Sequence, residues 1–116
     1  MKIYRISMQN IDLWLDDNRD PSDPKIQKLF GSKGTEVWVK TVPEAKVYLS
    51  QGIVASISFD NDLGTPEEGR HLADWIEEKA YNKEIPRMVW RVHSANVDAS
   101  PRIQAAMRNA ERFWED

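Results

Sequence analysis

Three short polar clusters in the sequence combine side chains that bind metal ions and phosphate. Each cluster directly follows an apolar run of the kind that forms a buried strand. The side chains are Asp16 and Asp17 in the first cluster, Asp60 and Asp62 in the second, and His93, Ser94 and Asn96 in the third. Carboxylates held close together raise one another's pKa unless a cation lies between them. Because Mg²⁺ and Mn²⁺ prefer oxygen ligands and leave positions open for phosphate and water, Asp16, Asp17 and Asp60 are predicted to bind one of these ions.

A simpler interpretation of these acids competes with the metal site. Aspartate is common in turns and at helix N-termini, where its carboxylate is solvated or accepts backbone hydrogen bonds. We assign that role to Asp20, Asp23 and Asp98. The acids of the first two clusters instead stand where apolar runs end, and this coincidence favours a binding site.

Alternating strand and helix patterns supply the elements that would hold the clusters together. The sequence predicts strands at 11–15, 36–40, 53–59 and 87–92 and helices at 24–30, 41–51, 66–82 and 100–114. This alternation predicts an α/β domain with a parallel sheet, right-handed crossovers and helices on both faces. Ligands bind beyond the carboxyl ends of the strands in such sheets, where the three clusters would meet. Residues 1–10 contain an alternating pattern and are a candidate for an extra edge strand.

Length, composition and charge limit the function classes. A chain of 116 residues with 41% hydrophobic residues is expected to fold as one domain spanning 1–116. It has no cysteine, which excludes disulfides, thiolate catalysis and sulfur-ligated zinc. The net charge of −3 disfavours a long nucleic acid as partner but leaves a small nucleotide or an RNA end open. With no long apolar run and no leader peptide in the sequence, we expect no membrane span and a cytoplasmic location.

The sequence also carries an ordered set of motifs that resembles a known family. The motifs are LWLDDNRDP, VPEA, SISFDNDLG with Gly69 after it, and VHSAN. Together they resemble the cyclic-phosphate processing receiver-like family and, more distantly, the receiver domains of two-component response regulators. The resemblance runs from Ile11 to the end of the sequence. It implies a flavodoxin-like, three-layer fold with a parallel sheet of strand order 2-1-3-4.

The resemblance to receiver domains implies roles for individual residues. In those domains an acidic pair after the first strand binds Mg²⁺, an aspartate after the third strand accepts a phosphoryl group, and a serine or threonine after the fourth contacts that group. Asp16 and Asp17, Asp60, and Ser94 occupy these positions. A receiver's fifth strand, with its phosphate-binding lysine, and its fifth helix have no counterpart in the sequence. The fourth strand is therefore expected at a sheet edge, in agreement with the alternation of Arg91 with apolar neighbours.

Three further side chains favour an enzyme over a phosphorylation switch, namely Asp62, His93 and Asn96. We expect metal-dependent hydrolysis or transfer of a cyclic or terminal phosphate on a nucleotide or RNA end. Asp60, Asp62 and His93 are the catalytic candidates, with His93 as the proton-transfer group because the unperturbed pKa of histidine lies near neutrality. The candidates for phosphate binding are Ser94, Asn96 and Arg19.

Other functions and roles remain open. The domain could be a phosphoacceptor receiver with Asp60 as the acceptor, which the missing lysine opposes, or a protein that binds a phosphorylated small molecule without turnover. Arg19 could be a solvent-exposed loop charge, and Asn96 could simply shape the loop before the last helix. His93 could pack against that helix and anchor the loop. His71, inside a predicted helix, is expected to be structural.

Overall fold

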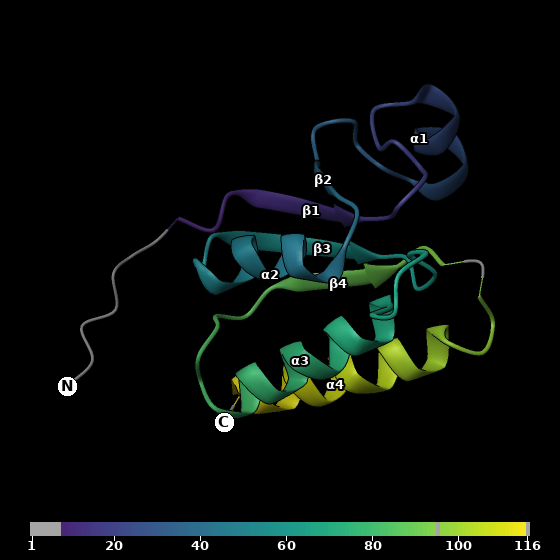
Figure 1. Ribbon diagram of the computed structural model, residues 1–116. Helices are drawn as coiled ribbons and strands as arrows, with labels where there is room; N and C mark the ends of the chain where they lie inside the picture. Colours follow the sequence, from purple (N-terminus) through teal and green to yellow (C-terminus); the bar gives the residue numbers. More distant parts are fainter. Residues whose placement is uncertain (1–7, 95, 116) are drawn as a thin grey trace.

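The computed structural model describes residues 8–94 and 96–115, and strands alternate with helices throughout this part of the chain. The strands are β1 (Ile11–Leu15), β2 (Val37–Val39), β3 (Val54–Phe59) and β4 (Val89–Val92), and the helices are α1 (Pro24–Phe30), α2 (Val42–Ser50), α3 (Gly69–Tyr81) and α4 (Ser100–Glu115) (Figure 1). All neighbouring strands are parallel, and their order across the sheet is β2-β1-β3-β4. The predicted receiver-like α/β fold with strand order 2-1-3-4 is therefore confirmed.

Capping signals in the sequence explain where the first two helices begin and end. Asp23 caps α1 by accepting a hydrogen bond from the Lys25 amide, and a proline occupies the first turn. Gly31 ends the helix at a φ of 76°, a left-handed conformation that favours glycine. Thr41 caps α2 in the same way as Asp23 caps α1. Both helices were predicted from these residues.

The third helix begins at Gly69 rather than at residue 66. Glu68 and His71 form a capping box at this point, in which the Glu68 amide donates to His71 Nδ1 at 2.8 Å. His71 thus has the structural role expected from the sequence. Gly69 also approaches the sheet so closely that a Cβ atom there would lie 2.1 Å from the Asp60 carbonyl oxygen. A glycine is therefore required where α3 meets the end of β3.

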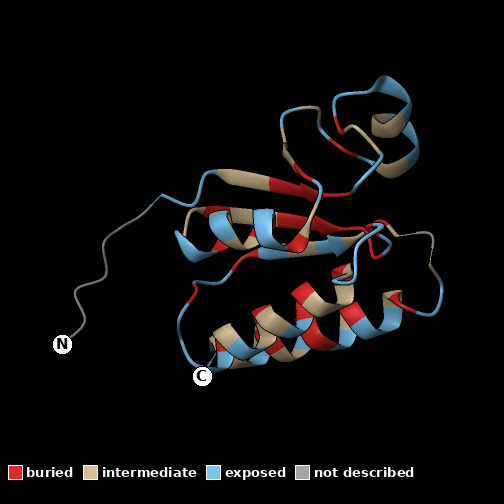
Figure 2. Ribbon diagram, in the orientation of Figure 1, coloured by how far each residue is buried: buried red, intermediate tan, exposed pale blue. Residues whose placement is uncertain are grey.

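The hydrophobic core lies on one face of the sheet. Leu13 and Leu15 of β1 share that face with Ile57 and Phe59 of β3, and each of the four is at most 1% exposed. The helices α2, α3 and α4 complete this core, and α3 and α4 lie side by side (Figure 1). The buried stripe of α4 consists of Ile103, Ala106, Met107 and Ala110, whereas Phe113 and Trp114, which were also expected on it, are half-buried. Figure 2 shows the buried residues concentrated in the central strands and along α3 and α4.

The opposite face of the sheet, which we call the open face, is more polar. It is formed by Asp12 and Trp14 of β1, Ser56 and Ser58 of β3, and Val89 and Arg91 of β4. The helix α1 stands apart from the other helices (Figure 1), buries none of its residues and leaves Leu29 72% exposed. Among the described strands β4 lies at an edge of the sheet, as predicted, and Arg91 is exposed. The helical cover is therefore concentrated on the apolar face.

The first described residues, 8–10, connect the start of the chain to the sheet. Of the candidate edge strand at 1–10, residues 1–7 lie outside the described residues, and residues 8–10 do not form a strand. The Gln9 side chain donates to the carbonyl oxygens of Val54 and Arg87 at 2.9 and 2.6 Å, which ties this segment to β3 and to the residues before β4. Within the described ranges, no helix combines the length and apolar character needed to cross a membrane.

Candidate functional site

The predicted polar clusters meet at the carboxyl end of the sheet. Asp16, Asp60 and His93 each follow the last residue of a strand. The backbone ladder continues through them, because the Asp60 amide donates to the Leu15 carbonyl at 2.8 Å and the His93 amide donates to the Phe59 carbonyl at 2.9 Å. Parallel pairing therefore places these three residues side by side, although they come from distant parts of the chain.

Asp16, Asp17 and Asp60 form an acidic cluster. Each offers one carboxylate oxygen, and these oxygens lie within 4.8 Å of one another. Asp16 and Asp60 are buried, whereas Asp17 is exposed. A hollow of about 300 Å³ opens beside the cluster, lined by Asp17, Asn18, Arg19, Asp60 and Asp62. The oxygen-only donor set and the open hollow fit a hard divalent ion such as Mg²⁺ or Mn²⁺.

Both carboxylate oxygens of Asp16 already accept hydrogen bonds. Oδ1 accepts from the backbone amides of Asn18 and Arg19, each at 2.9 Å. Oδ2 lies 3.2 Å from Arg19 Nη1 and 3.0 Å from His93 Nε2. Asp17 and Asp60 therefore have more coordination capacity left for a metal ion than Asp16 does.

Arg19 lies between the two buried carboxylates. Its Nη1 atom is 3.2 Å from Asp16 Oδ2 and 3.7 Å from Asp60 Oδ2, and its guanidinium group lies 4.5 Å from the centre of the Phe30 ring. Its carbonyl oxygen accepts a hydrogen bond from Trp14 Nε1 at 3.0 Å. The side chain is 27% exposed, so one side of the guanidinium group faces the hollow. Arg19 is thus built into the site and is not a loop charge surrounded by solvent.

The pKa values of the two buried carboxyl groups are shifted in opposite directions. Burial alone would raise the pKa of Asp16, but hydrogen bonds from His93, Arg19 and Asn18 outweigh burial and lower this pKa to about 2. Burial and, after it, the negative charge of Asp16 raise the pKa of Asp60 above its usual value. The ionised form of Asp60 is therefore disfavoured in the folded protein, and a cation bound beside it would relieve that cost.

Asp62 lines the hollow, and the side chain of Asn96 contacts it from the loop before α4. Asp62 Oδ1 accepts hydrogen bonds from the side-chain amides of Asn61 and Asn96, each at 3.1 Å. The Asn96 side-chain oxygen accepts from the Asp98 amide at 3.0 Å, in the turn before α4. Ser94 Oγ accepts from the Asn96 amide at 3.0 Å. Asn96 therefore shapes its loop, as one interpretation of the sequence held, and also contacts the second acid of the β3 cluster.

His93 is not among the side chains that line the hollow. Strand alternation continues through it, so its ring lies on the open face, 2.7 Å from Ser58 Oγ through Nδ1 and 3.0 Å from Asp16 Oδ2 through Nε2. The ring stacks on Trp14 with a centroid distance of 3.8 Å and an interplanar angle of 8°. Only 2% of the His93 side chain is exposed. His93 thus anchors its loop against Trp14, not against the last helix.

Three residues that organise the site were missed in the sequence. Asn61 is 1% exposed, and its side chain contacts Asp62, Glu68 and the Arg70 amide, which joins β3 to the start of α3. The other two are Ser58 and Trp14, which hold the His93 ring. Their positions in the sequence could have indicated these roles, because Asn61 stands between two acids, and Ser58 and Trp14 alternate with core residues along their strands.

The fold and the positions of its acids define the class of the protein. A parallel sheet of order 2-1-3-4, with acids at the ends of β1 and β3, is receiver-like. Residues 11–109 match the family described as "Cyclic-phosphate processing Receiver domain", and the chain therefore belongs to this family. Neither the curated proteins nor the solved structures yield a significant match. The family resemblance carried by the sequence motifs is confirmed.

Proposed function

We propose that this receiver-like domain hydrolyses or transfers a cyclic or terminal phosphate on a nucleotide or RNA end, with Mg²⁺ or Mn²⁺ bound at the acidic cluster. The observation that carries the proposal is the arrangement of Asp16, Asp17 and Asp60 within 4.8 Å beside a hollow of about 300 Å³. A phosphorylation switch needs these acids as well, but the hollow also presents Asp62 and Arg19. These two residues supply an additional carboxylate for proton transfer and a cation for binding a phosphate ester.

The metal would be held mainly by Asp17 and Asp60. Asp16 is in contact with both Arg19 and His93, so it would hold these side chains in place and contribute its charge. A divalent ion bound there would neutralise phosphoryl oxygens in the transition state. The raised pKa of Asp60 supports this assignment, because the site lacks the positive charge needed to balance two buried carboxylates fully.

The phosphate would be bound by groups of the chain at the same edge. Arg19 presents a guanidinium group whose planar donors match a phosphate, and Ser94 and Asn96 lie on the facing loop. Asp62 is exposed and accepts hydrogen bonds from the side-chain amides of Asn61 and Asn96, and in this proposal it would accept a proton from an attacking water. At this cluster Asp62 takes the proton-transfer role expected of His93, because the His93 ring lies on the open face and does not line the hollow.

Metal binding and turnover test this proposal separately. Mn²⁺ titration followed by the electron spin resonance of the free ion should show weak binding to the wild type and weaker binding to Asp17→Asn and Asp60→Asn. Asp20→Asn is the matched control, because the Asp20 carboxylate lies outside the cluster and accepts hydrogen bonds from Ser22. Equal Mn²⁺ binding by the wild type and Asp60→Asn would show that Asp60 is not a ligand of the metal ion.

Turnover of 2′,3′-cyclic nucleotides distinguishes the enzyme from the other function classes. We expect metal-dependent ring opening that Asp60→Asn lowers by about 10²-fold or more, the usual effect of removing a group that stabilises transition-state charge. Binding of the nucleotide without any ring opening would favour a binding protein. A stable acyl phosphate on Asp60 after treatment with a small phosphodonor would instead identify a phosphoacceptor receiver.

A further inference from the structure

A second group of hydrogen-bonded side chains lies on the open face of the sheet, next to the acidic cluster. Ser58 Oγ is 2.7 Å from His93 Nδ1, and His93 Nε2 is 3.0 Å from Asp16 Oδ2. A hydroxyl, an imidazole and a carboxylate in this order are the nucleophile, the base and the orienting group of covalent catalysis. The phosphate chemistry proposed for the acidic cluster does not use Ser58.

The hydrogen bonds of this group determine which atom carries each proton. The backbone amides of Asn18 and Arg19 donate to Asp16 Oδ1, and Arg19 Nη1 lies 3.2 Å from Oδ2, so the carboxylate is surrounded by N–H donors and acts as an acceptor toward His93. The proton of a neutral His93 ring must then be on Nε2, where it is donated to Asp16. Nδ1 is left as an acceptor, and the Ser58 hydroxyl donates to it. This is the proton arrangement in which a base removes a proton from an attacking hydroxyl.

The imidazole ring is held rigidly in this orientation. It stacks on Trp14 at 3.8 Å, and the edge of the Phe30 ring approaches it with a centroid distance of 6.2 Å and an interplanar angle of 73°. A ring fixed by two hydrogen bonds and two aromatic contacts pays little entropy to reach the reactive geometry. These contacts explain why His93 is buried, but they do not explain why its partner is a hydroxyl group.

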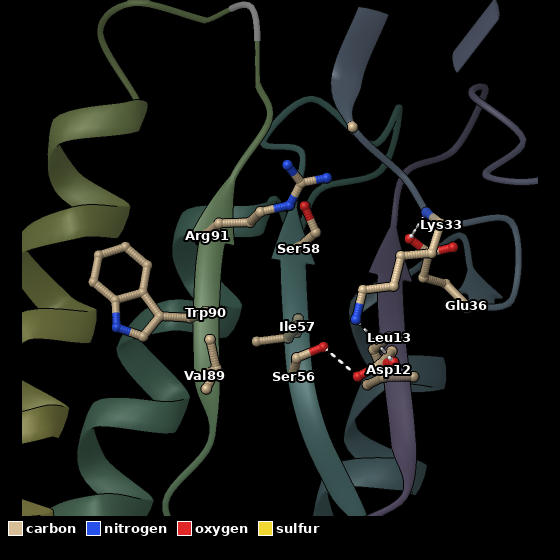
Figure 3. Close-up of a pocket in the computed structure, with 11 residues that line it drawn as sticks. Asp12, Leu13, Lys33, Glu36, Ser56, Ile57, Ser58, Val89, Trp90 and Arg91 are labelled. Atoms are coloured by element: carbon tan, nitrogen blue, oxygen red, sulfur yellow. Dashed lines mark hydrogen bonds and ion pairs between the residues drawn. The ribbon is translucent and has the colours of Figure 1, made fainter. Parts of the chain in front are cut away.

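Ser58 lines a groove of about 190 Å³ on the open face (Figure 3). Arg91, the partner of Ser58 in the register between β3 and β4, lines the same groove, and its side chain extends from β4 toward β3. Arg91 donates to the Phe30 carbonyl at 2.7 Å, and among the described residues no carboxylate forms an ion pair with it. A cation that forms no ion pair with the described residues therefore stands beside the hydroxyl, in a groove that Asp12, Lys33 and Glu36 also line.

We propose that Ser58 is a nucleophile that accepts the phosphoryl group of a small phosphate ester bound in this groove. Arg91 would hold the phosphate, since a guanidinium group matches two phosphoryl oxygens and balances their charge. The site is independent of a metal ion and lies on the face of the sheet, whereas the acidic cluster lies at its carboxyl end. The two sites have Asp16 in common.

The proposed step is a complete phosphoryl transfer. The Ser58 oxygen forms a bond to phosphorus while the bond from phosphorus to the ester oxygen breaks. The Ser58 proton moves to His93 Nδ1 and from there to the departing ester oxygen, so the products are phosphoserine and an alcohol. No oxidant, reductant or metal ion enters this balance.

Phosphorylation by p-nitrophenyl phosphate in the presence of a chelator tests the proposal without a contribution from the metal site. The wild type should gain the mass of one phosphoryl group and release p-nitrophenolate, and peptide mapping should place the group on Ser58. The linkage should resist hydroxylamine, which cleaves an acyl phosphate on Asp60. Ser58→Ala should abolish the labelling, and His93→Gln should slow it by about 10²-fold or more, the usual effect of losing a general base.

Ser56 provides the matched control, because it lines the same groove but donates to Asp12 at 2.6 Å and has no histidine partner. In Ser56→Ala, peptide mapping should still place the phosphoryl group on Ser58. A second measurement uses the absence of cysteine from the chain. The thiol in Ser58→Cys should react with iodoacetamide at least tenfold faster than that in Ser56→Cys, although Ser58 is the more buried position. The proposal is overturned if Ser58 gains no phosphoryl group, if His93→Gln is labelled at the wild-type rate, or if the two thiols react equally fast.

Discussion

Replacing Asp16 with asparagine should destabilise the protein at neutral pH. The carboxylate is completely buried and accepts four hydrogen bonds from Asn18, Arg19 and His93. Burial by itself would raise its pKa, but the hydrogen bonds lower it from 3.8 to about 2. At about 1.4 kcal/mol per pKa unit, the difference between these two values corresponds to about 2 kcal/mol of stability.

The pH dependence of this effect has a definite sign. The pKa of Asp16 is lower in the folded than in the unfolded protein, so its contribution is fully present above pH 3.8 and is lost as the pH falls through about 2. Urea unfolding of the wild type and of Asp16→Asn between pH 2 and pH 7 measures it. We expect a difference of about 2 kcal/mol at pH 7 that shrinks toward pH 2. Carboxylates distant from Asp16 cancel in this difference. Asp60 does not, because the variant lacks the Asp16 charge that raises the pKa of Asp60, and this partly offsets the loss.

Two outcomes would contradict this reasoning. If Asp16→Asn is as stable as the wild type at pH 7, the four hydrogen bonds do not outweigh the cost of burying the carboxylate. If the variant is less stable by the same amount at all pH values, the loss comes from changed packing and not from the charge of Asp16.

Two further substitutions have predicted effects on stability. Asp60→Asn should raise the melting temperature at pH 7 in the presence of a chelator. Burial and the charge of Asp16 raise the pKa of Asp60, so its ionised form lowers the stability of the folded protein. The gain should shrink as the pH falls toward 3.8, and a lower melting temperature of the variant at pH 7 would refute the argument. Gly69→Ala should destabilise by about 1–3 kcal/mol in urea unfolding, since the new Cβ atom would lie 2.1 Å from the Asp60 carbonyl oxygen. In an unconstrained helix the same change would stabilise by up to about 1 kcal/mol, so a more stable variant would show that this close approach does not exist.

Much of the fold was predictable because it depends on local patterns. Apolar and aromatic runs determined the four strands, and capping residues such as Asp23 and Thr41 determined helix starts. The start of α3 was predicted at residue 66, whereas the helix begins three residues later at Gly69, which is in close contact with the end of β3. That contact joins the helix to another element and leaves no local signal.

The composition of the acidic cluster was likewise predictable. In a parallel sheet all strands end at the same edge, so residues that directly follow strands must be neighbours. Asp16, Asp17 and Asp60 meet for this reason. The sequence by itself thus determined that these three acids meet at one edge of the sheet, whereas it did not show that Asn18 lines the hollow or that His93 does not.

Only the tertiary structure decided what each side chain contacts. His93 lies on the open face because the ladder of β3 and β4 continues through it, and it meets Ser58 and Asp16, which are 35 and 77 residues away in the sequence. Arg19 lies between two carboxylates because Phe30 and Trp14 hold it there. Such contacts depend on the packing of several elements at once, and a pattern within one segment does not contain that information.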